Sequence, residues 1–243
     1  RFDDGKPPVA FLRHSDSWLG NTTPASPAYI AEIDAVAEWP MSGIRGYSIT
    51  VDGTVPDDDV EIFAAQDYER FRATYVMQSL AEGTTTVRLR TVSNAGVPSE
   101  AIGTAYVRLD RTPPVITGGG LPVDGYWYRD SLPISLEAKD QENLSGMFPA
   151  LPESPPEEGA HIAYQLDSGS TQRVGGDRTQ VVVDTDGRHT LRYQAFDVAG
   201  NGSVEKEVGF KIDGTPPVGT FRALDPGDPR ALRVDVADAT SGI

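Results

Sequence analysis

Apolar and polar residues alternate one by one in several short stretches of this chain. Ile134, Leu136 and Ala138 are each followed by a polar residue, and so are Leu191 and Tyr193. A period of two predicts β-strands that bury one face and leave the other in water. Strands of a parallel sheet would be apolar on both faces, so the alternation argues against a parallel sheet, and it equally excludes a helical bundle. The sequence therefore predicts an all-β chain of antiparallel two-sheet sandwiches, with turn residues between short strands.

Two short motifs recur along the chain in the same order. Pro-Pro-Val occupies residues 7–9, 113–115 and 216–218, so its copies are 106 and 103 residues apart. Ser-Gly-Ile or Ser-Gly-Met occupies residues 42–44, 145–147 and 241–243. Two motifs that return together at nearly constant spacing indicate an internal repeat of one structural module.

The repeat divides the chain into four segments. Residues 1–6 are interpreted as the tail of a preceding module, 7–112 as the first module, 113–215 as the second, and 216–243 as the N-terminal part of a third. The last segment has 28 residues, too few to close a sandwich. We expect it to be disordered, to dock on the second module, or to pair with another chain. The chain opens in mid-strand, which indicates a piece of a longer polypeptide.

Two stretches of the first module leave the common pattern. Residues 26–39 resemble a helix locally, with a serine cap and a proline at the first helical position. The repeat places a strand there, and because tertiary pairing commonly overrides local propensity, we predict a strand. Residues 57–75 have no full counterpart in the second module. We predict an elaborated loop there, with one helical turn near residues 60–65.

The second module has an insertion and a turn signal of its own. Residues 147–159 contain four prolines and three glutamates, which predicts an exposed and semi-rigid loop. The apolar residues 181–183 run into Asp186-Gly187, a pair that favours a tight turn between paired strands. The sequence therefore predicts a hairpin at this point.

The composition narrows the function classes. The chain has 36 acidic and 21 basic residues and a formal net charge of −15, which opposes binding to nucleic acid and anionic membranes and favours divalent cations. It contains no cysteine, and repeated β modules without disulfides are typical of a bacterial surface or secreted protein. No apolar run approaches the ~20 residues of a membrane span, so we expect no membrane insertion within this chain.

The second module carries a recognisable series of residues. It begins with Pro113-Pro114 and Trp127-Tyr128, continues with Asp140, Ser145-Gly146 and Tyr164-x-Leu166-Asp167, and ends with Gly187-x-His189-x-Leu191-x-Tyr193-x-Ala195-x-Asp197-x-Ala199-Gly200-Asn201. This series resembles the bacterial immunoglobulin-like and fibronectin-III-like tandem repeats of large surface and secreted proteins. The first module departs from it at residues 93–97, where the Asp and the final Asn are missing. The resemblance implies tandem immunoglobulin-like antiparallel β-sandwiches over nearly the whole chain. It implies little about function, because such modules serve as spacers, adhesin stalks and enzyme appendages.

The resemblance also implies that the incoming linker, the loop after the first core strand and the last hairpin loop meet at one pole of each sandwich. The polar residues that would meet there are Asp110, Asp140, Glu142, Asp197 and Asn201, followed at the next pole by Asp213 and Asp238. Hard oxygen ligands from several loops suit Ca²⁺. The alternative is that these side chains bond backbone amides and cap the module junctions. Both interpretations stay open, and no other cofactor is predicted.

No residue set demands catalysis. His14, His161 and His189 lie far apart in the sequence, and His189, at a strand start, is interpreted as a packing or surface residue. No zinc-protease, nucleophile-elbow or phosphate-loop motif is present. We therefore predict a non-enzymatic, extracellular array that acts as a stalk, spacer or adhesive module. The alternative is a carbohydrate- or substrate-binding accessory region of a secreted hydrolase. The expected partners are neighbouring modules and a cell-surface or extracellular glycan or protein, with no nucleic acid.

Overall fold

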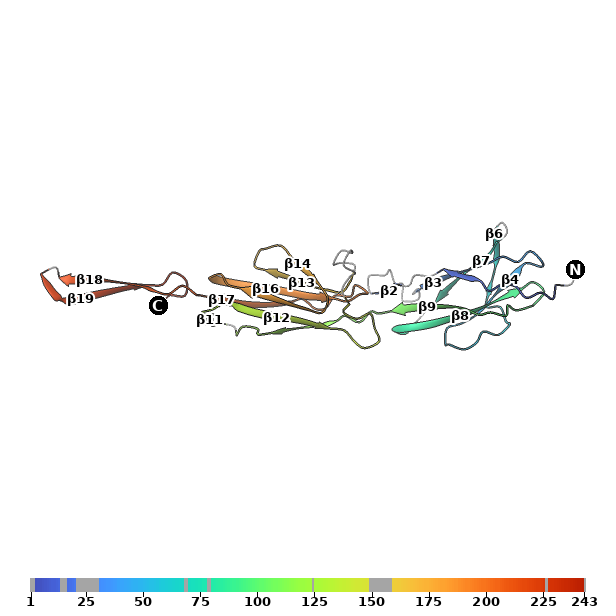
Figure 1. Cartoon of the computed structure of the whole chain (residues 1–243), viewed down its shortest axis with the longest axis horizontal. Helices are drawn as coiled ribbons and strands as arrows, with labels where there is room; N and C mark the ends of the chain where they lie inside the picture. Colours follow the sequence, from blue (N-terminus) through green and yellow to red (C-terminus); the bar gives the residue numbers. More distant parts are fainter. Residues whose placement is uncertain are drawn as a thin grey trace. The chain divides into compact units, whose positions relative to one another are not determined.

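The computed structural model describes residues 3–13, 17–20, 31–67, 70–77, 80–123, 125–148, 159–225 and 227–242. All secondary-structure elements assigned in these ranges are β-strands, as predicted (Figure 1). The chain separates into two compact units. The first consists of Arg1–Thr112 with the loops Gln141–Gly146 and Val198–Asn201, and the second of Pro113–Asp140, Met147–Asp197 and Gly202–Ile243.

The first unit contains two sheets. One sheet has the order β1 (Phe11–Arg13), β3 (Ala31–Ala37), β7 (Arg70–Met77) and β6 (Ala65–Asp67). The other has the order β2 (Trp18–Leu19), β9 (Gly103–Leu109), β8 (Gly83–Ser93), β4 (Ile44–Thr50) and β5 (Ile62–Phe63). Apart from β2, which runs parallel to β9, all pairs are antiparallel. The buried core consists of Ala10, Ala37, Ile44, Tyr47, Ile49, Ala73, Val87, Leu89, Ala105 and Val107.

The second unit contains a sandwich with the same plan. One sheet has the order β10 (Val115–Gly119), β12 (Leu132–Lys139) and β15 (Arg178–Val183). The other has the order β11 (Trp127–Tyr128), β17 (Lys206–Ile212), β16 (Gly187–Phe196), β13 (His161–Leu166) and β14 (Gln172–Gly175), with β11 parallel to β17. The core alternates along these strands and consists of Ile116, Ile134, Leu136, Ala138, Ile162, Val181, Val183, Leu191, Tyr193, Ala195, Phe210 and Ile212.

The structure confirms one disputed strand and corrects two other predictions. Ala31–Ala37 is the strand β3, so tertiary pairing does override the local helical signal. Residues 57–75 are not a loop with a helical turn, because they contain β5, β6 and much of β7, and β7 pairs with every residue of β3. Asp186-Gly187 does not form a hairpin. The strand before it, β15, pairs with β12, whereas β16 pairs with β13 and β17, so the chain crosses between sheets there. The insertion at residues 147–159 lies almost entirely outside the described residues.

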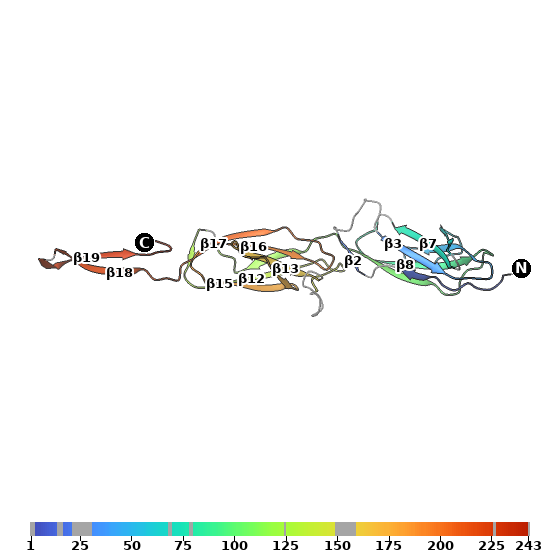
Figure 2. The ribbon, with the colours of Figure 1, turned by 90° about the horizontal axis from the view of Figure 1, so that it is seen from above.

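The last described strands form a separate two-stranded sheet. β18 (Val218–Asp225) and β19 (Asp228–Ala237) pair antiparallel, and both views show them as a two-stranded ribbon (Figures 1 and 2). Several of their large apolar side chains are exposed, in contrast to the closed cores of the two sandwiches.

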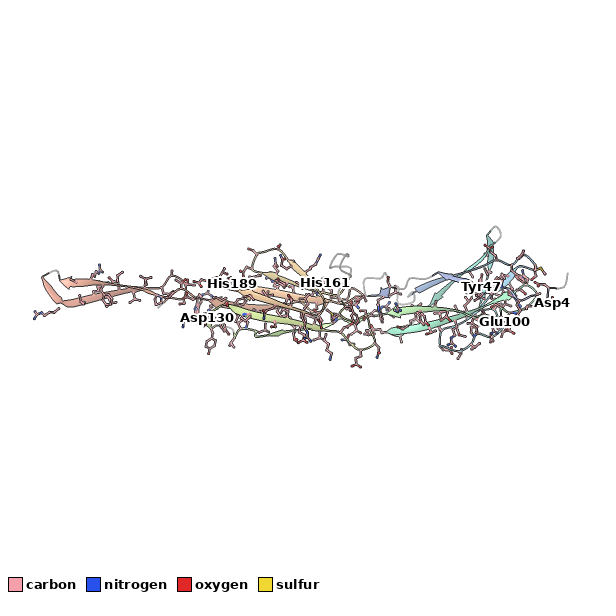
Figure 3. All side chains as sticks on the ribbon, viewed as in Figure 1. Asp4, Tyr47, Glu100, Asp130, His161 and His189 are labelled. Atoms are coloured by element: carbon pink, nitrogen blue, oxygen red, sulfur yellow. The ribbon has the colours of Figure 1, made fainter. Side chains whose placement is uncertain are left out.

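Tyr47 gives the first sandwich a specific sensitivity to alkaline pH. Its ring is fully buried, within the first sandwich (Figure 3). Burial raises the pKa of its hydroxyl far above the ordinary value, although a backbone hydrogen bond from Ala37 partly opposes the shift. Because the folded pKa is the higher one, this stabilisation is complete below about pH 10 and is lost as the pH rises further.

We therefore expect the unfolding free energy of the first sandwich to fall above about pH 10, by about 1.4 kcal/mol per pH unit for this one proton. Tyr47→Phe should remove that slope and cost about 0.5–1.5 kcal/mol at neutral pH, from the lost hydrogen bond. Urea unfolding of the first unit between pH 7 and 12 measures both effects. An equally steep slope in Tyr47→Phe would contradict the assignment.

Candidate functional site

Asp110 is a fully buried residue at the point where β9 ends. Its backbone N–H donates to the carbonyl of Leu19 at 2.9 Å. Its carboxylate accepts hydrogen bonds from the backbone N–H groups of Thr112, at 3.0 Å, and Ser145, at 2.9 Å. Its backbone carbonyl accepts a further one from the side-chain amide of Asn201 at 3.0 Å. These bonds all lie within the first unit, and they fix the chain where it leaves the sandwich.

The two loops that contact Asp110 are also bonded to each other. The backbone N–H of Ala199 donates to the hydroxyl of Ser145 at 3.2 Å, and that of Val198 donates to the carbonyl of Gly146 at 3.2 Å. Gly146 has a φ of 78° and lies in the left-handed region that favours glycine. The Ser-Gly motif therefore supplies a hydroxyl and a tight bend that hold the second loop against the first.

The other predicted site residues border these loops. Asp140 directly precedes the loop Gln141–Gly146, and Asp197 directly precedes the loop Val198–Asn201. Asp110 and Asp197 are buried, Asp140 is half-buried and Glu142 is exposed. The carboxylate oxygens of Asp110 accept hydrogen bonds from backbone amides, as a capping residue does.

A similar aspartate, Asp3, precedes the first module and accepts hydrogen bonds from neutral donors of that module. The carboxylate of Asp3 accepts a hydrogen bond from the indole N–H of Trp39 at 2.9 Å. Hydrogen bonds from Ser42, first, and Trp39, second, lower the pKa of Asp3 below its ordinary value. Ser42 occupies the same place in its Ser-Gly motif as Ser145. A contact between a linker aspartate and this serine is therefore present here as well.

The same contact occurs a third time, in the second unit. The carboxylate of Asp213 accepts hydrogen bonds from the backbone N–H groups of Thr215 and Ser241, both at 3.1 Å. Asp238 accepts bonds from Thr240 at 2.9 Å and Ser241 at 3.0 Å. The backbone bond from Thr240 is the largest cause that lowers the pKa of Asp238. Asp213 and Asp238 thus both accept a hydrogen bond from the backbone N–H of Ser241.

Asp186 is a capping residue that sequence reasoning missed. Its carboxylate accepts a hydrogen bond from the backbone N–H of Gly214 at 2.7 Å and another from the hydroxyl of Thr215. The bond from Thr215 is the largest cause of its lowered pKa, and the nearby charge of Asp238 opposes that shift. The shared sequence Asp-x-Thr-Pro-Pro at residues 110–114 and 213–217 signals the caps made by Asp110 and Asp213, because an aspartate commonly bonds the backbone two residues ahead, but it does not signal Asp186.

The two histidines that the structure describes, His161 and His189, make buried contacts within the second sandwich. The two ring nitrogens of His189 lie 2.9 Å from the carboxylate of Asp167 and 2.8 Å from the carbonyl of Thr185. The ring of His161 stacks on Phe196, with centroids 4.9 Å apart. Both rings are buried, and the contacts of His189 fix the start of β16. His14 lies outside the described residues.

Gly20 leaves the space that the loop Val198–Asn201 occupies. It is buried, and a Cβ at this position would lie 2.1 Å from the carbonyl oxygen of Ala199. Gly20→Ala should therefore displace the loop and destabilise the first unit by about 1–3 kcal/mol. Gly119→Ala is the matched control, because there the nearest atom to a new Cβ is 3.8 Å away. Urea unfolding compares the two variants, and equal stabilities would contradict the steric argument.

Three comparisons relate this chain to known proteins. No protein-family model and no curated protein sequence matches this chain. Solved structures that match this chain include the fibronectin(III)-like modules of Clostridium thermocellum CbhA (12% identity, TM-score 0.36, covering 84% of this chain and 94% of that one). The D00–D0 domain of intimin gives 10% identity and a TM-score of 0.35 over 83% and 99% of the two chains. The human OSCAR ligand-binding domain gives 10% and 0.33 over 84% and 99%.

The strand order decides the fold class. In the second unit the sheet β10–β12–β15 faces a sheet in which β16 lies between β17 and β13. In the first unit the counterpart β1–β3–β7 faces a sheet in which β8 lies between β9 and β4. Connections that cross between two antiparallel sheets in this way are those of the immunoglobulin-like sandwich. The fold is immunoglobulin-like. Among the described residues, no helix could cross a membrane.

Proposed function

We propose that this chain is a non-catalytic, extracellular array of immunoglobulin-like modules that acts as a stalk, spacer or adhesive module. The observation that carries the proposal is the repeated bond between a linker aspartate and the serine of a Ser-Gly motif. It joins Asp3 to Ser42, Asp110 to Ser145 and Asp213 to Ser241. A contact repeated before each Pro-Pro pair serves every linker alike, whereas a ligand site would be specific to one module.

The linker chemistry supports the same role. Each carboxylate accepts a hydrogen bond from the backbone N–H two residues ahead, which restricts the residues just before a Pro-Pro pair, and the φ of each proline is already fixed. The third segment, residues 216–243, fits the role of the front of a further module. Its strand pair has the register of β10 and β12, with Val218 opposite Ala237 as Val115 is opposite Lys139.

Exchange of a module tests the proposal. Residues 113–215 would be replaced, within the polypeptide that carries them, by an unrelated immunoglobulin-like module of equal length with the linker aspartates retained. A spacer should keep its surface display and reach, and a deletion of the same residues should reduce them. Loss of function in the exchanged protein, with display intact, would contradict a spacer and indicate a specific ligand.

A hollow on the second sandwich favours the alternative, an accessory region that binds carbohydrate or substrate. It has a volume of about 220 Å³ and lies over β13, β14 and β16. Its lining includes Tyr164, Gln165, Arg173, Arg192 and Gln194. Amides, guanidinium groups and a phenol suit hydroxyl-rich ligands. Glycan binding that Arg173→Ala abolishes would support this alternative over the spacer.

We infer that Asp110 caps the loops and that Asp140 and Asp197 are not calcium ligands, since Asp3 and Asp213 make the same kind of backbone contact as Asp110. We expect the melting temperature to be the same after chelator treatment and in millimolar calcium, in a thermal unfolding series. A rise of several degrees with calcium, absent in Asp197→Asn, would instead assign these residues to Ca²⁺, because a ligand that binds only the folded state stabilises it.

A further inference from the structure

The hollow on the second sandwich has a simple cause in the pattern of its side chains. Ile162 of β13 is in the core and Tyr164 packs against it, so Ala163 between them points to the outer face of the sheet. Ala163 is opposite Arg173 of β14 on one side and Gln194 of β16 on the other. A small outward side chain therefore lies in the middle of a row of long ones, and the hollow of about 220 Å³ is the space above it.

The two sides of the hollow differ in charge. Arg173 lies on β14, at one edge of the sheet, and has no acidic partner among the described residues. Glu205, which precedes β17, lines the opposite side. The strands β13, β14 and β16 contain three arginines and no aspartate or glutamate, in a chain whose net charge is −15. An anionic group is therefore attracted to the side of the hollow that Arg173 lines.

Two glutamines give the hollow fixed hydrogen-bond acceptors. The side-chain amide of Gln165 donates to the carbonyl of Gly169 at 2.7 Å. That of Gln194 donates to the carbonyl of Ser203 at 2.6 Å. Each bond holds its amide in place and leaves the side-chain oxygen to accept from a ligand. Both glutamines line the hollow, so a ligand that satisfies it presents hydroxyl donors as well as a negative charge.

The first sandwich has an equivalent of Ala163. The strands β8 and β16 begin at corresponding glycines of the repeat, so Arg90 of β8 corresponds to Gln194 of β16. Ser48 is opposite Arg90, as Ala163 is opposite Gln194. Ser48 lies between two core residues of β4 and therefore also points outward. It is nevertheless buried, whereas Ala163 is half-buried.

Carboxylates of the chain itself bind at this place in the first sandwich. The hydroxyl of Ser48 donates to the carboxylate of Asp57 at 3.1 Å, and Arg90 is ion-paired to Asp58 at 3.1 Å. Both aspartates belong to the loop between β4 and β5. Among the described residues of the second sandwich the same place is open. The comparison of the two modules therefore indicates a carboxylate as the group that fits the hollow.

We propose that the hollow binds a uronic-acid residue of an acidic glycan, with the sugar carboxylate at Arg173 and the hydroxyl groups at Gln165 and Gln194. Arginine binds carboxylates through two parallel N–H groups. A uronic acid carries the carboxylate and the hydroxyl donors in one unit, whereas an acidic peptide offers the carboxylate without the hydroxyls. The hollow is smaller than the roughly 300–1,000 Å³ of sites for drug-sized ligands, which suits a single sugar residue. The proposal rests on the accessory alternative of the proposed function and names its ligand class.

Titration of the 243-residue chain with sodium glucuronate and sodium galacturonate, followed by nuclear magnetic resonance, tests the proposal. We expect saturable shifts of amide signals in β13, β14 and β16 with at least one of the two, at millimolar concentrations. Glucose and galactose lack the carboxylate and acetate lacks the hydroxyls, so each should bind at least about tenfold more weakly. Saturable shifts with neither uronate would overturn the proposal. Equally tight binding of acetate or of a tetra-aspartate peptide would also overturn it, in favour of a simple carboxylate or an acidic peptide.

Three variants locate the binding. Arg173→Ala should weaken uronate binding by at least about tenfold. Arg178→Ala is the matched control: Arg178 is also exposed on an edge strand, β15 of the other sheet, but is paired with Glu137, and its loss should leave binding unchanged. Ala163→Leu fills the hollow from its outer face and should abolish binding. The same spectra show whether each variant stays folded.

Two outcomes separate this proposal from the function on which it rests. Equal weakening by Arg173→Ala and Arg178→Ala would indicate attraction by net charge alone and would overturn the proposed site. Glucose or galactose that binds as tightly as the uronates, and is lost in Ala163→Leu, would overturn the carboxylate but retain the carbohydrate-binding alternative. The spacer role is tested by the module exchange and does not depend on either result.

Discussion

Leu191→Ala is expected to destabilise the second sandwich by about 2–5 kcal/mol. Leu191 is fully buried in β16 and lies opposite Leu166 on one neighbouring strand and Val208 on the other. Truncation to alanine removes its packing with both sheets and leaves a cavity that the surrounding strands close only in part. For a sandwich of about 100 residues a loss of this size is a large share of the total stability.

Hydrogen exchange read out by peptide, together with urea unfolding, measures this effect. Arg192→Ala is the matched control, because Arg192 follows Leu191 in the same strand but extends to solvent, where it pairs with Glu207 at 2.7 Å. An exposed ion pair of this kind contributes about 0–1 kcal/mol. The first sandwich should keep its protection in both variants, since its core is a separate cluster. A loss below about 1 kcal/mol in Leu191→Ala would contradict the packing described.

Asp110→Ala should cost the first unit about 2–4 kcal/mol. The substitution leaves the buried N–H groups of Thr112 and Ser145 without their acceptor, and hydrogen bonds to a charged group are the stronger kind. The loop that contains Ser145 would lose its attachment first. Faster hydrogen exchange at Ser145 and Thr112 and a lower urea midpoint are the expected signatures.

Two further variants separate the hydrogen bonds from the charge. Asp110→Asn keeps one side-chain oxygen as an acceptor and should recover part of the loss. Asp4→Ala removes an exposed aspartate at the same distance from a Pro-Pro pair and should have little effect. If Asp110→Ala were as stable as Asp4→Ala, the capping role of Asp110 would be refuted.

The sequence predicted the strands well wherever one face is buried and the other is wet. Leu191 and Tyr193 lie inward as the period of two indicates, and β3 forms because the repeat outweighs the local helical signal. The pairing partners were harder to predict. Asp186-Gly187 favours a turn, but local residues do not decide whether the next strand joins the same sheet or the facing one, and here it joins the facing one.

The capping contacts were predictable in kind more than in detail. Spacing from the Pro-Pro pair indicates Asp4 as the counterpart of Asp110, but Asp3 makes the bonds, because Trp39 and Ser42 lie within its reach. Asp186 was missed because its partner Gly214 lies 28 residues further along the chain. Contacts of this length depend on how the sheets are connected, and no local pattern encodes them.

The bonds of Asp110 bear on how the chain should be divided for expression. Cleavage after Thr112 would look natural from the Pro-Pro motif, yet it would separate Ser145 and Asn201 from the residue that holds them. A truncation that begins at Pro113 would retain both loops while losing their anchor. Recombinant pieces that carry the second sandwich should therefore start upstream of Asp110.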